Sequence, residues 1–169
     1  MIRTGADIVV RRAKTSDSEG LAKVFAESWH HAYLGIIPYS HLEGLVRRRG
    51  NAWWRNAVKT EGHLLVLEIG GEMAGYATCG AARQGGRYRG EIYELYLCPQ
   101  HQGLGLGEYL FEACRSQLDT RGLDGLIVWA LEDNTLACDF YRRRGGRLAG
   151  RTNERFGAAK RVKLAYGWA

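Results

Sequence analysis

A run of alternating glycines between a strand and a helix constrains this chain more than any other feature. Gly103, Gly105 and Gly107 follow an apolar stretch that ends at Leu97, and a helical pattern over 106–121 follows them. Glycine permits positive φ and lets backbone N–H groups come close to a ligand. At the start of a helix, such N–H groups and the helix dipole favour an anion. The sequence therefore predicts a strand–loop–helix unit that holds phosphate oxygens.

Two common nucleotide loops do not fit this spacing. A dinucleotide-binding G-x-G-x-x-G loop that begins at Gly103 would need glycine where Glu108 stands. A P-loop needs Gly-Lys-Ser/Thr, and that triplet occurs nowhere in the 169 residues. The glycine run therefore binds a phosphate group of another kind, or it is a tight connection without a ligand.

Strands and helices are expected along the rest of the chain. Ser16 to Glu19 has the form of a capping box, and apolar residues at helical spacing follow it until about Gly35. Gly70-Gly71 predicts a hairpin turn. Strands are expected over 8–11, 63–69, 73–82, 91–97, 126–131, 147–152 and 161–166, and further helices from Pro38 and over 51–60, 106–121 and 133–144. Without a repeat or linker, residues 1–169 are expected to form one domain of the α/β or α+β class, with helices on both faces of a sheet.

Several classes of protein are disfavoured by composition. No apolar run approaches the ~20 residues that cross a bilayer, and the N-terminus lacks the apolar segment of a secretory signal. The cysteines at 79, 98, 114 and 138 have no zinc or redox spacing. We therefore expect reduced thiols, no metal and a cytoplasmic protein.

The positive charge is concentrated near the C-terminus. Residues 139–169 carry 9 Lys and Arg against 2 Asp and Glu, whereas residues 1–138 carry 15 against 16. This excess indicates either a solvated Arg-rich surface or an anionic ligand held near this region. The arginine runs 47–49 and 142–144 are interpreted as exposed helix ends.

Three motifs resemble the GNAT superfamily of N-acetyltransferases. Gln102-x-x-Gly105-x-Gly107 is similar to the family's acetyl-CoA loop. Asn134-x-x-Ala137-x-x-Phe140-Tyr141-x-x-x-Gly145 is similar to a second family segment, and Ser28-Trp29-x-x-Ala32-Tyr33-x-Gly35-Ile36-Ile37-Pro38 resembles one of small bacterial members. Gly146 departs from the family, which mostly has phenylalanine there, so the packing after this helix is open. The resemblance implies a mixed sheet of about seven strands, flanked by helices and splayed at the acetyl-CoA site.

The resemblance also implies acetyl-CoA as co-substrate. Its diphosphate would bind the loop formed by Gln102, Gly103, Leu104, Gly105, Leu106, Gly107 and Glu108. The pantetheine arm would pair with the strand edge at Leu95, Tyr96 and Leu97, where a backbone N–H would stabilise the thioester oxygen. Asn134 and Tyr141 would complete the cofactor site, and Arg142 to Arg144 would alternatively pair with the 3′-phosphate.

The reaction implied by the resemblance is direct attack of a primary amine on the thioester. The amine arrives protonated, so a base must accept its proton. Glu91, which opens its strand, is the first choice; Glu94 is the rival, because one bulge would exchange which carboxylate faces the cleft. Tyr141 is expected to protonate the leaving thiolate.

The acceptor side is expected at Trp29, Tyr33 and Glu94, with core packing as the alternative for the two aromatics. A small-molecule amine is the favoured acceptor. A protein or peptide amine, or aminoacyl-tRNA, is the alternative; a non-catalytic acyl-CoA or RNA-binding module is less favoured. No nucleic-acid motif is present, no membrane partner is expected, and a homodimer is compatible with the sequence.

Overall fold

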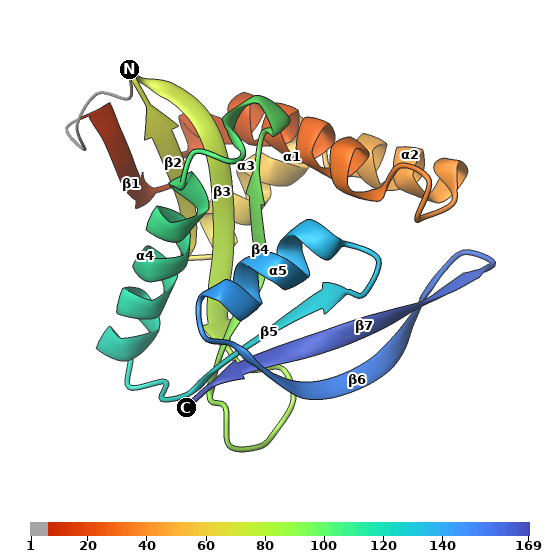
Figure 1. Ribbon diagram of the computed structural model, residues 1–169. Helices are drawn as coiled ribbons and strands as arrows, with labels where there is room; N and C mark the ends of the chain where they lie inside the picture. The colour runs from red at the N-terminus through yellow and green to blue at the C-terminus, as the bar shows by residue number, and fades with distance from the viewer. Residues whose placement is uncertain (1–6) are drawn as a thin grey trace.

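Seven strands form one mixed sheet in the computed structural model, which describes residues 7–169 (Figure 1). The strands are β1 Ile8–Arg12, β2 Leu64–Ile69, β3 Glu72–Ala81, β4 Gly90–Leu97, β5 Leu126–Leu131, β6 Arg147–Phe156 and β7 Ala159–Trp168. Their order across the sheet is β1-β2-β3-β4-β5-β7-β6. All neighbours are antiparallel except β4 and β5, which are parallel. The predicted fold class is confirmed.

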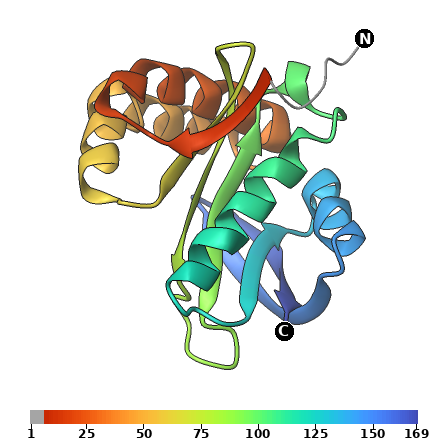
Figure 2. The same ribbon diagram turned by 90° about the vertical axis from the view of Figure 1, so that its left-hand side faces the viewer.

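Five α-helices cover the two faces of this sheet (Figure 2). They are α1 Ser18–Tyr33, α2 Tyr39–Arg48, α3 Asn51–Thr60, α4 Leu106–Thr120 and α5 Thr135–Arg143, with short 3-10 helices η2 Thr15–Asp17 and η3 Pro99–His101. Helices α4 and α5 pack on one face, and α1 and α3 pack on the other. None of the helices in residues 7–169 is long and apolar enough to cross a membrane.

The core lies in two layers because the central strands are covered on both faces. Leu110, Phe111 and Cys114 of α4 are fully buried on one side. Leu21 and Phe25 of α1 are fully buried on the other side. Strand β3 is therefore buried from Ala74 to Gly80, as expected for a strand between two helical layers.

The site is formed where the sheet opens between β4 and β5. These two strands pair only through Gly90–Leu126, Glu91–Ile127 and Ile92–Val128. In β4 the register against β3 shifts between Ile92 and Glu94, so that Tyr93 is an extra residue. Such a bulge bends and twists a strand. Beyond it β4 diverges from β5, and the predicted splay is confirmed.

Two local expectations were wrong. The last two strands extend well beyond 147–152 and 161–166, to form the long β6–β7 hairpin, because only Gly157, at φ +61°, and one neighbour are needed for the turn. The Ser16–Glu19 capping box does not form; instead the Asp17 carboxylate accepts the Lys14 N–H at 2.7 Å and opens η2. The expectation about a secretory signal concerns in part residues 1–6, which lie outside the described residues.

Candidate active site

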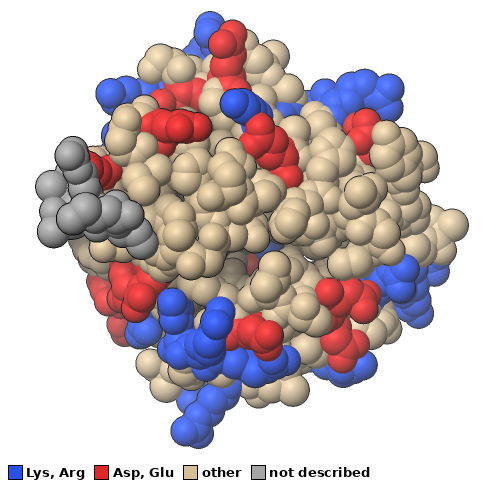
Figure 3. Space-filling model, turned by 45° about the horizontal axis from the view of Figure 1, so that its top comes forward, with Lys and Arg blue, Asp and Glu red and all other residues tan. Residues whose placement is uncertain are grey.

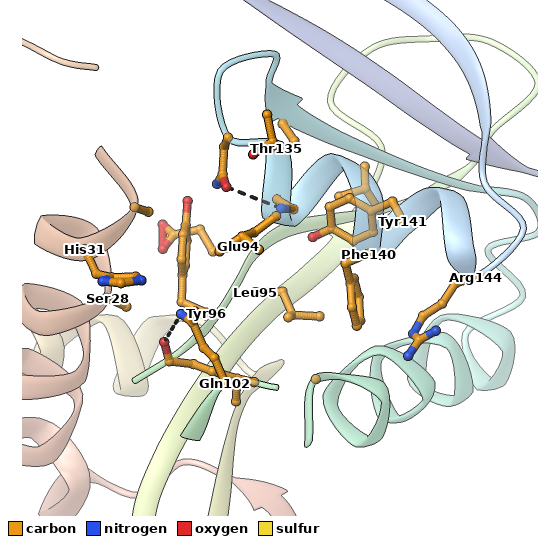
Figure 4. Close-up of a pocket in the computed structure, with 18 of the residues that line it drawn as sticks. Ser28, His31, Glu94, Leu95, Tyr96, Gln102, Thr135, Phe140, Tyr141 and Arg144 are labelled. Atoms are coloured by element: carbon orange, nitrogen blue, oxygen red, sulfur yellow. Dashed lines mark hydrogen bonds between the residues drawn. The ribbon is translucent and has the colours of Figure 1, made fainter. Parts of the chain in front are cut away.

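A cavity of about 710 Å³ occupies the opening between β4 and β5 (Figure 4). Helix α1 walls it on one side and α5 on the other, with the first turn of α4 below. Its lining includes the expected cofactor residues Leu95, Tyr96, Leu97, Gln102, Gly103, Gly105, Leu106, Gly107, Asn134 and Tyr141. Leu104 and Glu108 are the two expected loop residues that do not line it; Leu104 is 46% exposed.

The glycine loop presents unpaired backbone donors to this cavity. Gly103 and Gly105 have φ of +74° and +77°, which only glycine adopts readily. The N–H groups from Gly103 through Gly107 have no hydrogen-bond acceptor within residues 7–169. They stand at the start of the fifteen-residue helix α4, where the helix dipole adds positive potential. The loop can therefore bind the oxygens of a phosphate group.

Gln102 holds the loop against the strand that precedes it. Its side-chain Nε2 donates to the carbonyl oxygen of Leu97 at 3.2 Å (Figure 4). This bond fixes the distance between the end of β4 and the glycine loop. The segment Glu94–Leu97 has no strand partner on its β5 side, so its backbone can pair with an extended ligand.

Tyr141 lies in the wall formed by α5. The side chain is 5% exposed, and its hydroxyl points toward the cavity (Figure 4). Burial raises the pKa of this hydroxyl above its usual value, so it stays protonated at neutral pH and can donate a proton. Asn134 accepts the Ala137 N–H at 3.3 Å and caps α5, which places it beside the same cavity.

Glu91 and Glu94 lie on the same face of the sheet, the face that α1 covers. Glu91 pairs with Gly80 and Glu94 with Thr78 across β3, and the extra residue Tyr93 accounts for their odd spacing. Residues paired across two strands share a face. We expected a bulge to exchange which of the two carboxylates faces the cleft. Instead, the bulge brings both carboxylates to the same side of the sheet.

Each carboxylate is held by an arginine. Glu91 is 2% exposed and accepts bonds from the Arg83 backbone N–H at 3.0 Å and from Arg83 Nη2 at 2.5 Å. Glu94 accepts from Arg49 Nη1 at 2.6 and 3.0 Å and from the Tyr76 hydroxyl at 2.6 Å. Both line a second cavity of about 290 Å³, but only Glu94 also lines the wide one.

Trp29 and Tyr33 stand side by side in α1, as expected, and line the second cavity. Their ring centroids are 4.8 Å apart, and the Trp29 ring also lies 5.4 Å from that of Tyr96. The Tyr33 and Tyr96 hydroxyls bond each other at 2.6 Å. The two aromatics therefore serve both interpretations, since they belong to the core and also face a cavity.

Arg49 is a site residue that sequence reasoning missed. It was interpreted as part of an exposed helix end, but its side chain is only 22% exposed. Its guanidinium lies 4.8 Å from the Phe25 ring centroid and 4.5 Å from that of Trp53, and it reaches Glu94 from there. No local signal marks this contact, because the partners are 45 residues apart.

Two arginines at the end of α5 also line the wide cavity, whereas Arg142 pairs with Asp139 outside it. They are Arg143 and Arg144, and the Arg144 Nε is buried without an acceptor in residues 7–169. The Arg144 guanidinium stacks 4.4 Å from the Phe140 ring centroid (Figure 4). Arg144 Nη2 also lies 3.6 Å from Glu108 Oε2, so an anionic group of a ligand would share Arg144 with that carboxylate, beside Arg143.

Metal binding finds no support in the described side chains. No group of three or more His, Cys, Asp or Glu in residues 7–169 is placed to hold an ion. The four cysteines are free and buried.

Comparisons with known proteins agree with this geometry. A family model described as "Acetyltransferase (GNAT) family" matches residues 25–146. The chain is 28% identical over 163 residues to the uncharacterized N-acetyltransferase YuaI of Bacillus subtilis, a match that covers 95% of this chain and 92% of that protein. It is 32% identical over 118 residues to the mycothiol acetyltransferase of Paenarthrobacter aurescens, covering 69% of this chain but only 34% of that protein.

Solved structures share the fold at low sequence identity. The PaiA N-acetyltransferase of Thermoplasma acidophilum, solved with coenzyme A, superimposes with a TM-score of 0.76 at 18% identity, covering 95% of this chain and 99% of that one. YncA of Salmonella typhimurium, a putative acetyltransferase solved with its cofactor acetyl-CoA, has a TM-score of 0.67 at 20% identity, with coverages of 96% and 93%. At these identities the likeness concerns the fold.

Proposed function

Because this chain belongs to the acetyltransferase (GNAT) family, we propose that it transfers an acetyl group from acetyl-CoA to the primary amine of a small molecule. The observation that carries the proposal is the row of unpaired N–H groups from Gly103 to Gly107, which meets an unpaired stretch of β4 in one cavity. Residues 1–169 would act as one domain. The four free thiols support a cytoplasmic location.

The cavity fits acetyl-CoA through three separate groups of residues. The glycine loop would hold the diphosphate, with Arg143 or Arg144 on a further phosphate. The β4 backbone at Leu95–Leu97 would pair with the two amides of the pantetheine arm. Acetyl-CoA would supply the acetyl group as a thioester, and coenzyme A would leave as the thiolate when the C–S bond breaks.

Protons would move at two sites in this chain. A carboxylate on the α1 face, Glu94 or Glu91, would accept a proton from the acceptor's ammonium, either directly or through water, so that the free amine can attack the thioester. Glu94 is favoured by its place in the wall of both cavities. Tyr141, buried and protonated in the opposite wall, would donate a proton to the leaving sulfur.

The loop assignment is tested by acetyl-CoA binding. Gly105→Val places a branched side chain where phosphate oxygens would approach, so calorimetry should show binding at least about tenfold weaker, or about 1.4 kcal/mol. Gly71→Val is the matched control, because Gly71 has a similar φ of +81° and open space around it but lies in the β2–β3 turn. Equal binding by both variants would refute the assignment.

The base is tested by pH–rate profiles, once an acceptor is known. Glu94→Gln should lower kcat/KM most at low pH, where free amine is scarce, with partial recovery as the pH rises. Glu91→Gln serves as the comparison, and a selective loss in that variant would assign the base to Glu91 instead. Unchanged profiles in both glutamine variants would leave proton removal to ordered water.

The proton donor is tested separately. Tyr141→Phe should lower kcat while acetyl-CoA affinity stays nearly unchanged.

A further inference from the structure

The smaller cavity lies directly beside the wide one. Both share the side chains of Tyr33, Tyr93, Glu94, Tyr96, Trp129 and Ala130 in their walls. A group held in the smaller cavity can therefore reach the end of β4, where the thioester is expected. The volume of about 290 Å³ is just below the range of roughly 300–1,000 Å³ for small-molecule sites.

Aromatic rings form much of the wall of this cavity. They belong to Trp29, Tyr33, Tyr93, Tyr96, Trp129 and Phe156. Trp29, Tyr33 and Tyr96 make a continuous cluster, with ring centroids 4.8 to 6.3 Å apart and ring planes tilted by 46° to 71°. The Tyr33 and Tyr96 hydroxyls bond each other, so the rings offer their apolar surfaces. Such a wall suits a flat apolar body, and its ring faces also attract an ammonium group.

The charges in the wall are balanced. Arg49, Arg83 and Lys163 stand against Glu91, Glu94 and Glu154. Arg49 pairs tightly with Glu94 at 2.6 Å and Arg83 with Glu91 at 2.5 Å, whereas the Lys163–Glu154 pair is looser, at 3.9 Å. A wall with no net formal charge has no excess of carboxylates for a polycation. One ammonium would share the Glu94 carboxylate with Arg49 and the Tyr76 hydroxyl, and the neighbouring ring faces would add to its attraction.

The β6–β7 hairpin contributes Glu154, Phe156 and Lys163 to the wall of the smaller cavity. Arg161 Nε of β7 donates to the Ile36 carbonyl oxygen at 2.9 Å. Phe156, at the end of β6, packs with Ile37 and Leu42, and its ring lies edge-on to His41 at 5.6 Å. On the face turned to the viewer in Figure 3, Lys and Arg side chains alternate with Asp and Glu side chains around a small hollow near the middle. An extended peptide would need an open groove between the α1–α2 connection and this hairpin.

From these observations we infer that the smaller cavity is the acceptor site, and that the acceptor is a small primary amine with one positive charge and a flat apolar body, such as an arylalkylamine. This inference rests on the acetyl transfer proposed above. The ammonium end lies at Glu94, beside the wide cavity, and the flat body lies against the aromatic wall.

Three kinds of acceptor distinguish this inference from its rivals. Release of free thiol from acetyl-CoA is measured with 2-phenylethylamine and tyramine, with spermidine, and with a short peptide that has a free N-terminus. We expect kcat/KM for an arylalkylamine to exceed the values for spermidine and for the peptide at least tenfold. Preference for spermidine or the peptide overturns the inference but leaves acetyl transfer standing.

A substitution in the wall tests the flat body itself. Phe156→Leu keeps an apolar side chain but removes the ring, so KM for 2-phenylethylamine should rise several-fold while KM for hexylamine and the affinity for acetyl-CoA stay unchanged. Leu148→Ala, on the same strand and 64% exposed outside both cavities, is the matched control. Equal changes for the two amines, or none, overturn the assignment of the wall.

Acetyl-CoA binding, measured separately by calorimetry, separates the two proposals. Binding without turnover of any arylalkylamine overturns the acceptor inference alone. Absence of binding overturns the proposed function, and the inference falls with it.

Discussion

At the scale of single residues, the Trp168 ring fills the space that a side chain at position 146 would occupy. A Cβ at Gly146 would lie 2.6 Å from Cζ2 of Trp168 and 2.9 Å from the Tyr141 carbonyl oxygen. The Trp168 ring packs 5.2 Å from Phe111, and its Nε1 donates to the Arg144 carbonyl at 2.9 Å. The C-terminal strand thus supplies the apolar anchor after α5, which resolves the doubt raised by the missing phenylalanine.

This replacement predicts a specific coupling between the two positions. Gly146→Ala should destabilise the fold by about 1–3 kcal/mol, because the methyl group overpacks against the ring. In a Trp168→Leu background the cost should be smaller, although contact with the Tyr141 carbonyl remains. Urea unfolding of the four proteins in the double-mutant cycle measures the difference. Equal costs in both backgrounds would show that the backbone contact alone excludes a side chain.

At the scale of elements, the start of α1 depends on an ion pair rather than on the expected capping box. Arg11 donates to both oxygens of Asp17, at 2.8 and 2.9 Å, and also to Glu68 at 2.6 Å. These bonds join β1, η2 and β2. The hydrogen bonds from Arg11 lower the pKa of Asp17 below its usual value.

That shift predicts how stability depends on pH. A carboxyl with a lowered pKa in the folded state stabilises the fold fully above its unfolded value of about 3.9, and this contribution is lost as the pH falls through the folded value. Asp17→Asn should therefore cost about 1–2 kcal/mol at pH 7 and less below about pH 4, as measured by urea unfolding. Glu27→Gln, which breaks a 3.9 Å pair with Lys23, whose side chain is 72% exposed, should change stability by less than about 0.5 kcal/mol at either pH. A cost for Asp17→Asn that does not change with pH would argue against the ion pair.

At the scale of the whole molecule, the two parts of the sheet are joined by only three residue pairs between β4 and β5. The cavity lies between these parts, with β4 in one wall and α5 in the other. A ligand that fills it contacts both parts. Its binding should therefore stabilise the junction more than the distant β1–β2 edge.

Hydrogen exchange with mass spectrometry can measure this effect. At 100 times its dissociation constant, acetyl-CoA should stabilise the fold by about 2.7 kcal/mol. Exchange should slow most in α5, the first turn of α4 and the second half of β4, and least in β1. Protection centred on β1 and β2 would place the ligand elsewhere.

The sequence by itself determined the types of the elements, the glycine loop and the family. These features depend on residues that are close together in the sequence: the spacing of apolar residues, the positive φ that Gly103 and Gly105 allow, and motifs that span about twelve residues. Alternation along β4 could not place Glu91 and Glu94, because the bulge at Tyr93 arises from pairing with β3.

Only the tertiary structure decided which distant side chains meet around the smaller cavity and after α5. Arg49 reaches Glu94 across 45 residues of sequence, and Arg161 reaches Ile36 across 125. Trp168 fills the space beside Gly146 from the last strand. Each of these contacts depends on how separate elements pack against one another. The residues next to a side chain in the sequence therefore cannot predict a partner that lies far away along the chain.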